Sequence, residues 1–477
     1  MWSCLFLKKG GLKNLGCLFS SNDCVAALAT PALKSGLGVI RISGEGAIEK
    51  ISKIFKPGRI DSLTKMKGYE AAYGFIVDLK GNRIDDAVAV VFREPHSYTG
   101  EDVVELSCHG GPVILNLVLE MCFNVGCKPA LNGEFTKRAF LNGKLSLTQA
   151  EAVYDVINAD STLSLKAANS VKNGFLFKKT QGVCEKLIEM NAHLEAYLNY
   201  PDEGVEEPEI SKLVIQIDSA IETLKVLVSN FRVSRNLKNG IKTVLIGEPN
   251  VGKSTLMNLL TGQNSSIVTE ISGTTRDVVR CDVEIGEIKF TLSDTAGFRQ
   301  STDEIEKEGI ARARHEFANA DLILMVVDGS KSFLNEIFYE VMAVKNSLKI
   351  CVLNKIDLGS FEFDSKKLDF DVFIKTSNKN LQSILGLKKA MVNLVKSKLL
   401  NRSSLSTVFF VNERQNRALN QAINELKEAK KTLQAGMGFD AVSSVIEAAI
   451  DKILELNGKK VSDELINKIF SKFCVGK

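Results

Sequence analysis

The sequence predicts a multidomain α/β protein, in which an α+β domain is followed by a helical domain that an inserted α/β domain interrupts. Three observations support this. The chain has 477 residues, enough for about three domains of roughly 100–200 residues each. Between residues 240 and 400, short apolar runs alternate with helical segments, which is typical of a parallel sheet wrapped by helices. Helical periodicity precedes and follows that region, and an insertion explains this arrangement economically.

The region 23–143 contains short β-branched or apolar runs broken by Gly, Asn and Asp, a pattern that predicts an α+β domain. We expect strands at 38–43, 69–77 and 87–92. From 144 to 239, apolar residues recur at three- and four-residue spacing, as in amphipathic helices. Helical segments are therefore predicted at 145–171, 182–198 and 209–237.

The α/β domain is predicted to span 240–400, with strands at 242–246, 289–292, 322–327 and 350–353. The chain then returns to helix, with strongly periodic segments at 416–434 and 441–456. We therefore assign 401–477 to the second part of the helical domain, which ends in the tail Phe473-Cys474-Val475-Gly476-Lys477.

Composition excludes several classes of protein. With 61 Lys and Arg against 57 Asp and Glu, the net charge is +4, too small to attract nucleic acid in general. Such contacts must come from local patches such as Lys178-Lys179 or Lys459-Lys460. The longest apolar run in the body, 322–327, is far shorter than the roughly 20 residues that cross a bilayer. We expect no membrane span.

Residues 1–22 form an N-terminal extension with three lysines and no acidic residue. Such a composition leaves open a mitochondrial targeting segment, but the absence of Arg and the pair Gly10-Gly11 count against it. We expect a cytoplasmic protein, with a mitochondrial location as the alternative. The ten cysteines include no CxxC pair and no Cys/His cluster with zinc spacing, which indicates reduced thiols.

The segment 247–254 is a GxxxxGKS loop, placed directly after one predicted strand and before a helix at 255–260. That context is the one this phosphate-binding motif requires. Backbone N–H groups wrap the phosphates, Lys253 reaches the β- and γ-phosphates, and Ser254 binds Mg²⁺. The loop residues expected to bind nucleotide are Asn250, Val251, Gly252, Lys253, Ser254 and Thr255.

Two later motifs select the nucleotide. Asp294-Thr295-Ala296-Gly297 follows a strand, which places a carboxylate near the metal and a Gly N–H near the γ-phosphate. Asn354-Lys355-Ile356-Asp357 resembles the guanine-reading NKxD element of GTPases, whose Asp accepts hydrogen bonds from the guanine N1 and exocyclic amine. Adenine offers no such pair of donors, so GTP is favoured over ATP. Ser377-Asn378 lies where the last nucleotide loop falls, although it departs from the usual Ser-Ala.

Gly273-Thr274-Thr275-Arg276-Asp277 lies between these motifs, so Thr275 is placed to complete Mg²⁺ coordination in a γ-phosphate-sensing switch. Phe298 follows Gly297, where small signalling GTPases carry a Gln that orients the attacking water. Because Phe cannot orient water, hydrolysis needs a polar group from elsewhere. The candidates just downstream are Arg299, Asp303, Glu304 and Glu306.

After about residue 23 the whole chain resembles the MnmE (TrmE) family of tRNA uridine-modification GTPases. The resemblance rests on three places. The first is the set of N-terminal segments 38–44, 97–102 and 105–112, which is similar to the family's folate-binding domain. The second is the inserted Ras-like GTPase domain with its Asn-Val-Gly-Lys-Ser loop and Gly-Thr-Thr-Arg-Asp switch. The third is the tail, similar to the family's Phe-Cys-Ile-Gly-Lys ending.

The resemblance implies a homodimer formed through the N-terminal domains, which bind 5-formyl- or methylene-tetrahydrofolate. With an FAD-dependent partner of the MnmG type, in a heterotetramer, it would add an aminomethyl or carboxymethylaminomethyl group to carbon 5 of the wobble uridine of tRNA. The implied folate contacts are Arg41, Glu105, Lys144 and Lys477. A carboxylate suits the amidine-like edge of a pterin, and Arg or Lys suits a glutamate tail. Arg41 also interrupts an apolar run, and a buried Arg needs a partner.

The family resemblance further implies a K⁺-activated, dimerisation-dependent GTPase. A K⁺ ion would neutralise phosphate charge where other systems use an arginine finger. Its implied ligands are Asn250, Thr269, Ile271 and Thr274, and Glu270, Ser272 and Gly273 complete the implied nucleotide loop. Glu306 matches the water-orienting glutamate, and Cys474 matches a cysteine near the folate that is a candidate for the modification chemistry. For the isolated His109 we expect a structural role rather than metal binding.

Two other functions remain open at this stage. A ribosome- or RNA-assembly GTPase of the Era-like class shares the phosphate loop and a hydrophobic residue after DTAG, but predicts a KH-type module with a GxxG loop. No such loop is visible. A folate-binding regulatory switch predicts linkage between GTP and folate without dependence on tRNA. The Cys474-containing tail favours tRNA modification, by resemblance.

Overall fold

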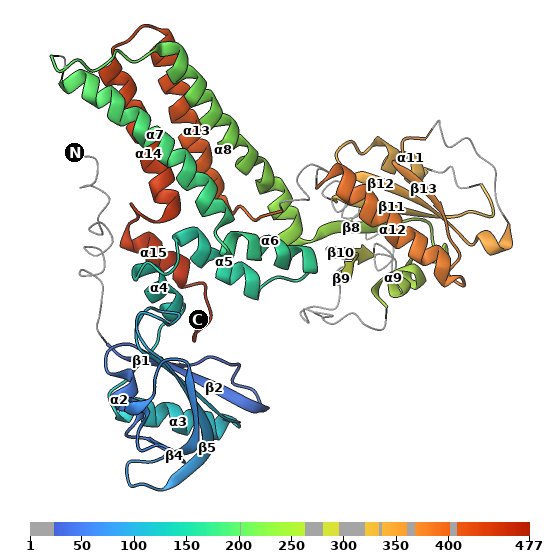
Figure 1. The fold of residues 1–477 in the computed structure, drawn as a ribbon. Coiled ribbons are helices and arrows are strands. Elements are labelled where there is room, and N and C mark those ends of the chain that lie inside the picture. The colour runs from blue at the N-terminus through green and yellow to red at the C-terminus, as the bar shows by residue number, and fades with distance from the viewer. Residues whose placement is uncertain are drawn as a thin grey trace, which may run out of the picture. The chain divides into compact units, whose positions relative to one another are not determined.

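The computed structural model describes residues 23–200, 202–262, 280–294, 320–332, 336–359, 368–400 and 408–477. The chain forms two compact units, which Figure 1 shows as a ribbon. The first unit contains the residues up to Tyr154 together with Lys172–Leu224 and Arg417–Lys477. The second contains Asp155–Val171 and Lys225–Asn416. We describe each unit by itself.

A seven-stranded sheet with the order β3-β4-β5-β6-β2-β1-β7 lies at the N-terminal end of the first unit. All neighbours are antiparallel except β1 and β7, which are parallel. The strands expected from the sequence correspond to β2, β4 and β5. The strand bounds are β1 Val25–Leu28, β2 Ser35–Ser43, β3 Phe55–Pro57, β4 Glu70–Val77, β5 Arg83–Phe92, β6 Val103–Gly110 and β7 Lys128–Pro129.

The helices α2 (Ala47–Ile51) and α3 (Pro112–Asn124) cover one face of this sheet, and the 3-10 turn η1 spans Leu63–Lys65. Alternate residues of a strand point to opposite faces. Ile40 and Ile42 of β2 are fully buried in the core with α2 and α3. Arg41, between them, therefore points to the other face. This alternation is what brings a charged side chain onto an otherwise apolar strand.

Helices make up the rest of the first unit, where α7 packs against α14. The stretch 145–171 forms two helices rather than one, because Ser161 caps the second: its hydroxyl accepts a hydrogen bond from the Ser164 N–H at 3.2 Å. Helix α6 belongs to the second unit except for Lys172, and α5, α8 and α13 extend into that unit. The bounds are α4 Glu134–Leu141, α5 Leu147–Ile157, α6 Thr162–Lys172, α7 Phe175–Asn199, α8 Ile210–Asn239, α13 Glu413–Gln434, α14 Phe439–Asn457 and α15 Asp463–Phe470.

The second unit contains a six-stranded sheet with the order β13-β12-β11-β8-β10-β9. Five strands are parallel, as the alternating pattern predicts. The strand bounds are β8 Ile241–Ile246, β9 Arg280–Ile285, β10 Ile288–Asp294, β11 Leu322–Asp328, β12 Leu348–Asn354 and β13 Val372–Lys375. The helices are α9 Lys253–Thr261, α11 Glu336–Ala343 and α12 Leu381–Lys398, with a 3-10 turn η3 at Ile356–Leu358.

The edge strand β9 corrects the expectation of a wholly parallel sheet, because it runs antiparallel to β10. Only Gly286 and Glu287 separate the two strands, and both have positive φ, 54° and 70°. Two such residues match the twist of a tight hairpin. Helix α6 packs at this hairpin, where the Leu163 N–H donates to the Glu287 carbonyl at 3.0 Å.

Among the helices in the described part of the chain, none combines the length and the apolar character needed to cross a bilayer. Eight of the cysteines lie in the same described part, and all eight are free thiols. Seven of these are buried and Cys474 is exposed. Burial raises the pKa of the Cys122 thiol to about 12, which keeps it protonated and unreactive at neutral pH.

Candidate guanine-nucleotide and C-terminal tail sites

The phosphate loop connects β8 to α9 at the carboxyl edge of the second sheet. Two of its glycines are required by the geometry. A Cβ at Gly247 would lie 2.0 Å from the Val326 carbonyl of β11, and Gly252, with φ 98°, is the N-cap of α9. The loop therefore follows the sheet closely and turns sharply into the helix. This directs the first N–H groups of α9 toward the loop, as an anion site needs.

Lys253 lies inside the phosphate loop rather than at the surface. Its side chain is 7% exposed, and its Nζ donates to the carbonyls of Gly247 at 2.9 Å and Glu248 at 2.7 Å. The two carbonyls hold the ammonium group over the loop. A cation held at this point can attract and neutralise a phosphate chain.

Two asparagine side chains connect the phosphate loop to the neighbouring strand ends. Asn354, the last residue of β12, donates from Nδ2 to the Val251 carbonyl at 2.7 Å. Asn378, just after β13, donates from Nδ2 to the Gly252 carbonyl at 3.1 Å. A Cβ at Gly252 would lie within 2.8 Å of both amide nitrogens. Asn378, where the usual motif has Ala, thus makes a contact with the phosphate loop that the sequence did not predict.

The Asp357 carboxylate is positioned by two neighbours. Oδ1 accepts a hydrogen bond from the Ser377 hydroxyl at 2.8 Å, and Oδ2 pairs with Lys379 Nζ at 3.1 Å. The hydrogen bond from Ser377 and then that from Lys379 lower the pKa of Asp357 below its usual value. The group is therefore an anionic acceptor at neutral pH, the state that reading two guanine donors requires.

Lys355 and Asp328 form a second link across the same edge of the sheet. Lys355 has a positive φ of 61°, and its Nζ lies 3.1 Å from Asp328 Oδ2 at the end of β11. Burial tends to raise the pKa of Asp328, but hydrogen bonds from Ser330 and Lys355 more than offset it and lower the pKa. Asp328 was not among the predicted site residues, because a single Asp at the end of a strand is common and indicates no function by itself.

The other predicted residues of the nucleotide site either have a known position in the fold or lie outside the described residues. Ser254 and Thr255 lie in the first turn of α9, and Asp294 is the last residue of β10. The predicted residues outside the described part of the chain are Thr269, Glu270, Ile271, Ser272, Gly273, Thr274, Thr275, Thr295, Ala296, Gly297 and Glu306.

A second cluster of charged residues lies in the first unit, on the sheet face opposite α2 and α3. Arg41 and Glu105 are directly opposed on β2 and β6, and Arg41 Nε donates to Glu105 Oε1 at 2.7 Å. Arg41 Nη1 also donates to the Gly476 carbonyl at 3.1 Å. Arg41 therefore has two partners, the Glu105 carboxylate and a backbone carbonyl of the C-terminal tail. They satisfy the charge that was expected to need a partner in an apolar run.

The C-terminal tail is bound to the N-terminal end of α4 by backbone hydrogen bonds. The Phe135 N–H donates to the Lys477 carbonyl at 3.2 Å, and the Gly133 N–H donates to the Cys474 carbonyl at 3.3 Å. Lys477 is half-buried here: burial, then the positive charges of Arg41 and Lys172, lower the pKa of its ammonium group. Residues at opposite ends of the chain thus form one cationic cluster.

Two aromatic rings flank the Arg41 guanidinium. Its Cζ lies 5.9 Å from the centre of the Tyr98 ring and 5.7 Å from that of Phe135. The Tyr98 hydroxyl is hydrogen-bonded to Thr136 at 2.9 Å. Lys144, the remaining predicted folate contact, donates to the Pro95 carbonyl at 2.9 Å. Tyr98 and Phe135 thus join the candidate site. The sequence did not single them out, because an aromatic side chain alone does not indicate a ligand.

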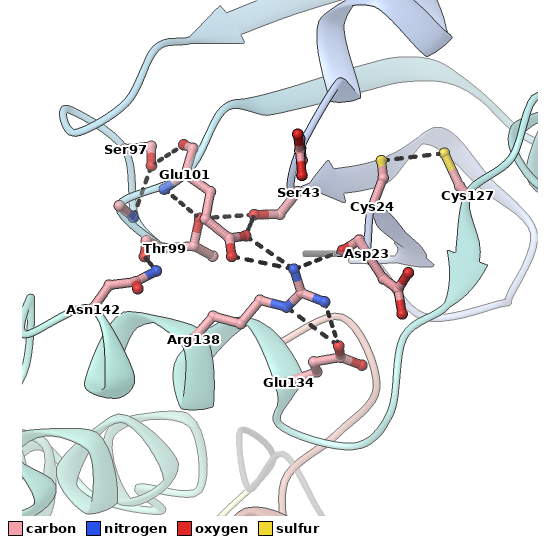
Figure 2. Close-up of polar contacts among 12 residues, drawn as sticks. Asp23, Cys24, Ser43, Ser97, Thr99, Glu101, Cys127, Glu134, Arg138 and Asn142 are labelled. Atoms are coloured by element: carbon pink, nitrogen blue, oxygen red, sulfur yellow. Dashed lines mark hydrogen bonds and ion pairs between the residues drawn. The ribbon is translucent and has the colours of Figure 1, made fainter. Parts of the chain in front are cut away.

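A buried network around Arg138 supports the loop that carries Tyr98 (Figure 2). Arg138 of α4 pairs with Glu101 at 3.1 Å and with Glu134 at 2.7 Å. It also donates to the Asp23 carbonyl at 2.9 Å. All three nitrogens of the guanidinium, Nε, Nη1 and Nη2, therefore have a hydrogen-bond acceptor, as a buried charge requires. The segment 97–102, prominent in the sequence, is thus held to α4 by side-chain hydrogen bonds.

His109 lies on the exposed end of β6. Its Nδ1 lies 2.7 Å from Asp85 Oδ1, and its backbone N–H donates to Asp85 Oδ2 at 2.8 Å. The hydrogen bond with Asp85 raises the pKa of His109. Among the described residues no group of three or more His, Cys, Asp or Glu side chains has the arrangement of a metal site.

The phosphate loop between β8 and α9, the NKxD element at the end of β12 and this strand order together define a P-loop GTPase of the Ras- and Era-like fold class. The flanking domains give the family. Residues 24–144 match the TrmE N-terminus family of GTP-binding proteins, and residues 147–474 match the MnmE helical domain family. The chain belongs to the MnmE family of tRNA modification GTPases, which confirms the resemblance drawn from the motifs.

Similar proteins extend over nearly the whole chain. The tRNA modification GTPase MnmE of Thermoanaerobacter pseudethanolicus is 36% identical over 462 residues, covering 95% of this chain and 99% of that protein. MnmE of Symbiobacterium thermophilum is 38% identical over 459 residues, with the same coverage. Among solved structures, the G domain of the T. maritima FeoB iron transporter covers 32% of this chain and 98% of its own, with 27% identity and a TM-score of 0.26.

Proposed function

We propose that this protein couples a cycle of GTP binding and hydrolysis to the modification of the wobble uridine of tRNA at carbon 5, using a one-carbon unit from a tetrahydrofolate. The modifying group is of the aminomethyl or carboxymethylaminomethyl kind. The observation that carries the proposal is the presence of two sites in one chain of this family. One is the loop around Lys253 and Asp357, and the other is the cluster of Arg41, Glu105 and Lys477.

For GTP, the support is chemical. Lys253 provides a cation in the phosphate loop, and Asp357 is an anionic acceptor that matches the two donors of guanine. Ser254 and Thr275 would hold Mg²⁺, which neutralises phosphate charge when bound. Asn250, with a φ of 60° in the loop, would hold K⁺ together with Thr269, Ile271 and Thr274. Glu306 would orient the attacking water.

For the folate, the support is the chemistry of the donor set. Glu105 offers a carboxylate to the pterin edge, and Arg41 and Lys477 offer cations to the glutamate tail. The Tyr98 ring beside Arg41 adds a flat apolar surface for a flat heterocycle. Lys144 would contact the ligand from the neighbouring loop. Cys474, the exposed thiol of the described part, would be available for the modification chemistry.

We further propose a homodimer that associates through the N-terminal sheet and joins an FAD-dependent MnmG-type partner in a heterotetramer. The sheet face opposite α2 and α3 supports the dimer. It exposes Leu37, Tyr73 and Val88, apolar side chains that a solvated face rarely gathers. The proposed substrate is tRNA, and the proposed location is the cytoplasm. Residues 1–22, on which the mitochondrial alternative depends, lie outside the described residues.

The first experiment is steady-state nucleotide hydrolysis by the purified chain in K⁺ and Na⁺ buffers of equal ionic strength, with ATP as a control. We expect turnover of GTP alone, and a sharp loss when Na⁺ replaces K⁺. A rate indifferent to the cation would remove the K⁺ assignment. Lys253→Ala should lose GTP binding and keep folate binding, whereas loss of both would indicate a folding defect.

The folate assignment is tested by calorimetric titration with 5-formyltetrahydrofolate. Arg41→Ala removes the charge-assisted hydrogen bond to Glu105, and such bonds contribute about 1.5–3 kcal/mol. We expect folate affinity to fall at least about tenfold, while GTP binding remains. Arg93→Ala, a cation in the same domain, is the matched control. Equal folate affinity in the wild type and in Arg41→Ala would exclude the site.

A further inference from the structure

We propose that four lysines, Lys172, Lys178, Lys179 and Lys459, form a docking surface for the phosphate backbone of the tRNA. The inference rests on the proposed function, in that it takes tRNA as the substrate. It adds where on this chain the polyanion binds. The four residues lie at the ends of three helices, separated by up to 287 residues of sequence, 172 to 459.

The fold brings the two lysine pairs of the sequence to the same end of the α7–α14 pair. Helix α7 begins at Phe175, and α14 ends at Asn457. The Thr180 hydroxyl in the first turns of α7 lies 3.0 Å from Asn457 Oδ1. Lys459 follows Gly458, whose φ of 90° turns the chain back so that the Lys459 N–H donates to the Leu454 carbonyl at 2.9 Å. Lys178 and Lys179 immediately precede Thr180.

Lys459 also lies near Cys184, one turn beyond Thr180 on α7. Burial raises the pKa of the Cys184 thiol to about 11, and the positive charge of Lys459 acts in the opposite direction. Lys459 must therefore lie close enough to α7 for its charge to be felt there.

The charge on this surface is not neutralised by neighbours. Within the described part of the chain, none of the four lysines forms an ion pair, and all four are exposed. Lys460 differs, because it is paired with Asp451. The carboxylate of Glu185, also near the surface, accepts a hydrogen bond from Gln181 at 3.0 Å. Unpaired lysines close together repel one another, and a polyanion relieves that repulsion.

One of the four lysines, Lys172, lies near the C-terminal tail. Gln149 Nε2 donates to the Lys172 carbonyl at 3.0 Å, and a Cβ at Gly174 would lie 3.5 Å from the same nitrogen. Lys172 is also among the charges that lower the pKa of Lys477. A phosphate backbone bound to these lysines would therefore pass beside the residues proposed to hold the folate.

A nucleic acid fits these features better than an acidic protein segment does. Lysine is a compact point charge that suits phosphates without imposing a fixed geometry, and sequence-independent backbone contact is how phosphate-binding lysines contribute affinity. The acidic-segment alternative predicts that tRNA binding does not depend on the four lysines.

The test measures binding of fluorescently labelled tRNA to the full chain by anisotropy between 50 and 200 mM KCl, concentrations at which phosphate contacts dominate the salt dependence. The variant is Lys178→Gln/Lys179→Gln/Lys459→Gln. Each phosphate contact contributes roughly 0.7–0.9 to the slope of log affinity against log salt. We expect affinity to fall at least about tenfold and the slope to decrease by about 2 to 3.

The matched control replaces three lysines of the first unit that are already paired. It is Lys212→Gln/Lys431→Gln/Lys452→Gln, on α8, α13 and α14, and the partners of these lysines are Glu209, Glu428 and Glu455. It changes the net charge equally and should bind tRNA within about twofold of the wild type, because paired surface lysines are largely neutralised. Lys178→Arg/Lys179→Arg/Lys459→Arg should bind tRNA as the wild type does, since the charge is kept.

The outcomes separate the inference from the function on which it rests. Equal affinity and equal salt slope in the glutamine variant and the wild type would overturn the docking surface and leave the tRNA substrate standing. A wild-type chain that does not bind tRNA even at the lowest salt would overturn both. The thermal unfolding midpoint shows whether the triple variant is folded. If it is not, the single charge reversal Lys459→Glu tests the surface, and it should weaken tRNA binding most at low salt.

Discussion

The Asn354 side-chain amide donates a hydrogen bond to the Val251 carbonyl at 2.7 Å. The bond joins the end of β12 to the phosphate loop, two segments 103 residues apart in the chain. Asn354 is buried, and its Oδ1 is 3.3 Å from the Thr376 hydroxyl. Both ends of the amide are thus hydrogen-bonded, and the NKxD element and the GxxxxGKS loop form one rigid edge.

Asn354→Ala should therefore weaken GTP binding, although Asn354 is not expected to contact the γ-phosphate. Removing a buried donor leaves the Val251 carbonyl unsatisfied, at a cost of about 1–3 kcal/mol, so we expect GTP affinity to fall about tenfold or more. Fluorescent-GTP titration measures this. Asn346→Ala, an exposed asparagine of the same unit, serves as the control, and equal losses in both variants would contradict the idea.

Asp357→Asn should change the nucleotide preference from GTP to xanthosine triphosphate. The carboxylate accepts from Ser377 and Lys379 and would accept from the two guanine donors. An amide presents one donor and one acceptor, so GTP binding should fall at least about tenfold. Xanthosine triphosphate, whose base carries a carbonyl in place of the amine, should bind better than GTP. Competition titration with the two nucleotides decides, and an unchanged preference for GTP would refute the assignment.

Gly476→Ala should release the C-terminal tail. Gly476 has a φ of 89°, which disfavours side chains, and a Cβ there would lie 2.2 Å from the Leu28 carbonyl. The backbone at Leu28 cannot move without disturbing β1. We expect the Phe135 N–H, which donates to the Lys477 carbonyl, to exchange with deuterium at least about tenfold faster. Val475→Ala, at an exposed position, should leave that protection in place.

The His109–Asp85 pair should make stability depend on pH. The hydrogen bond and charge of Asp85, then the charge of Asp86, raise the pKa of His109 in the folded state. A raised pKa means that the pair stabilises the fold fully below about pH 6.5, and that this contribution is lost as pH rises through the folded-state pKa.

Asp85→Asn should accordingly lower the thermal midpoint more at pH 6 than at pH 9. His109→Gln removes the titrating group, and Asp85→Asn removes the partner that raises its pKa. The difference between the thermal midpoints of these two variants should therefore not vary with pH through the histidine range. Thermal unfolding of the wild type and both variants across that interval measures the effect. A destabilisation by Asp85→Asn that is equal at the two pH values would contradict the proposal.

Much of the architecture could be read from local pattern. The GxxxxGKS loop between an apolar strand and a helix, and the alternation that follows it, predicted the position of β8, α9 and the parallel strands. The edge strand β9 was not predicted, because its antiparallel direction depends on a two-residue hairpin at Gly286 and Glu287. Period-two alternation says that a strand exists and does not say which way it pairs.

The residues of the candidate sites also differ in whether a local pattern could predict them. Lys253, Asn354 and Asp357 were predicted because each belongs to a contiguous motif. Tyr98, beside Arg41, was not, since its proximity follows from how α4 and the loop 97–102 pack around Arg138.

By itself, the sequence determined the chemistry that is written in short contiguous segments: a phosphate loop, a guanine-type acceptor and a tail ending in Gly476-Lys477. Local motifs need only neighbouring residues, so their spacing suffices. The tertiary structure alone decided that Arg41 meets the Gly476 carbonyl, 435 residues away, and that the lysines at 178–179 and 459 lie at one end of a helix pair. Such contacts depend on the packing of whole helices and sheets, where the burial of many apolar side chains sets positions that no local pattern encodes.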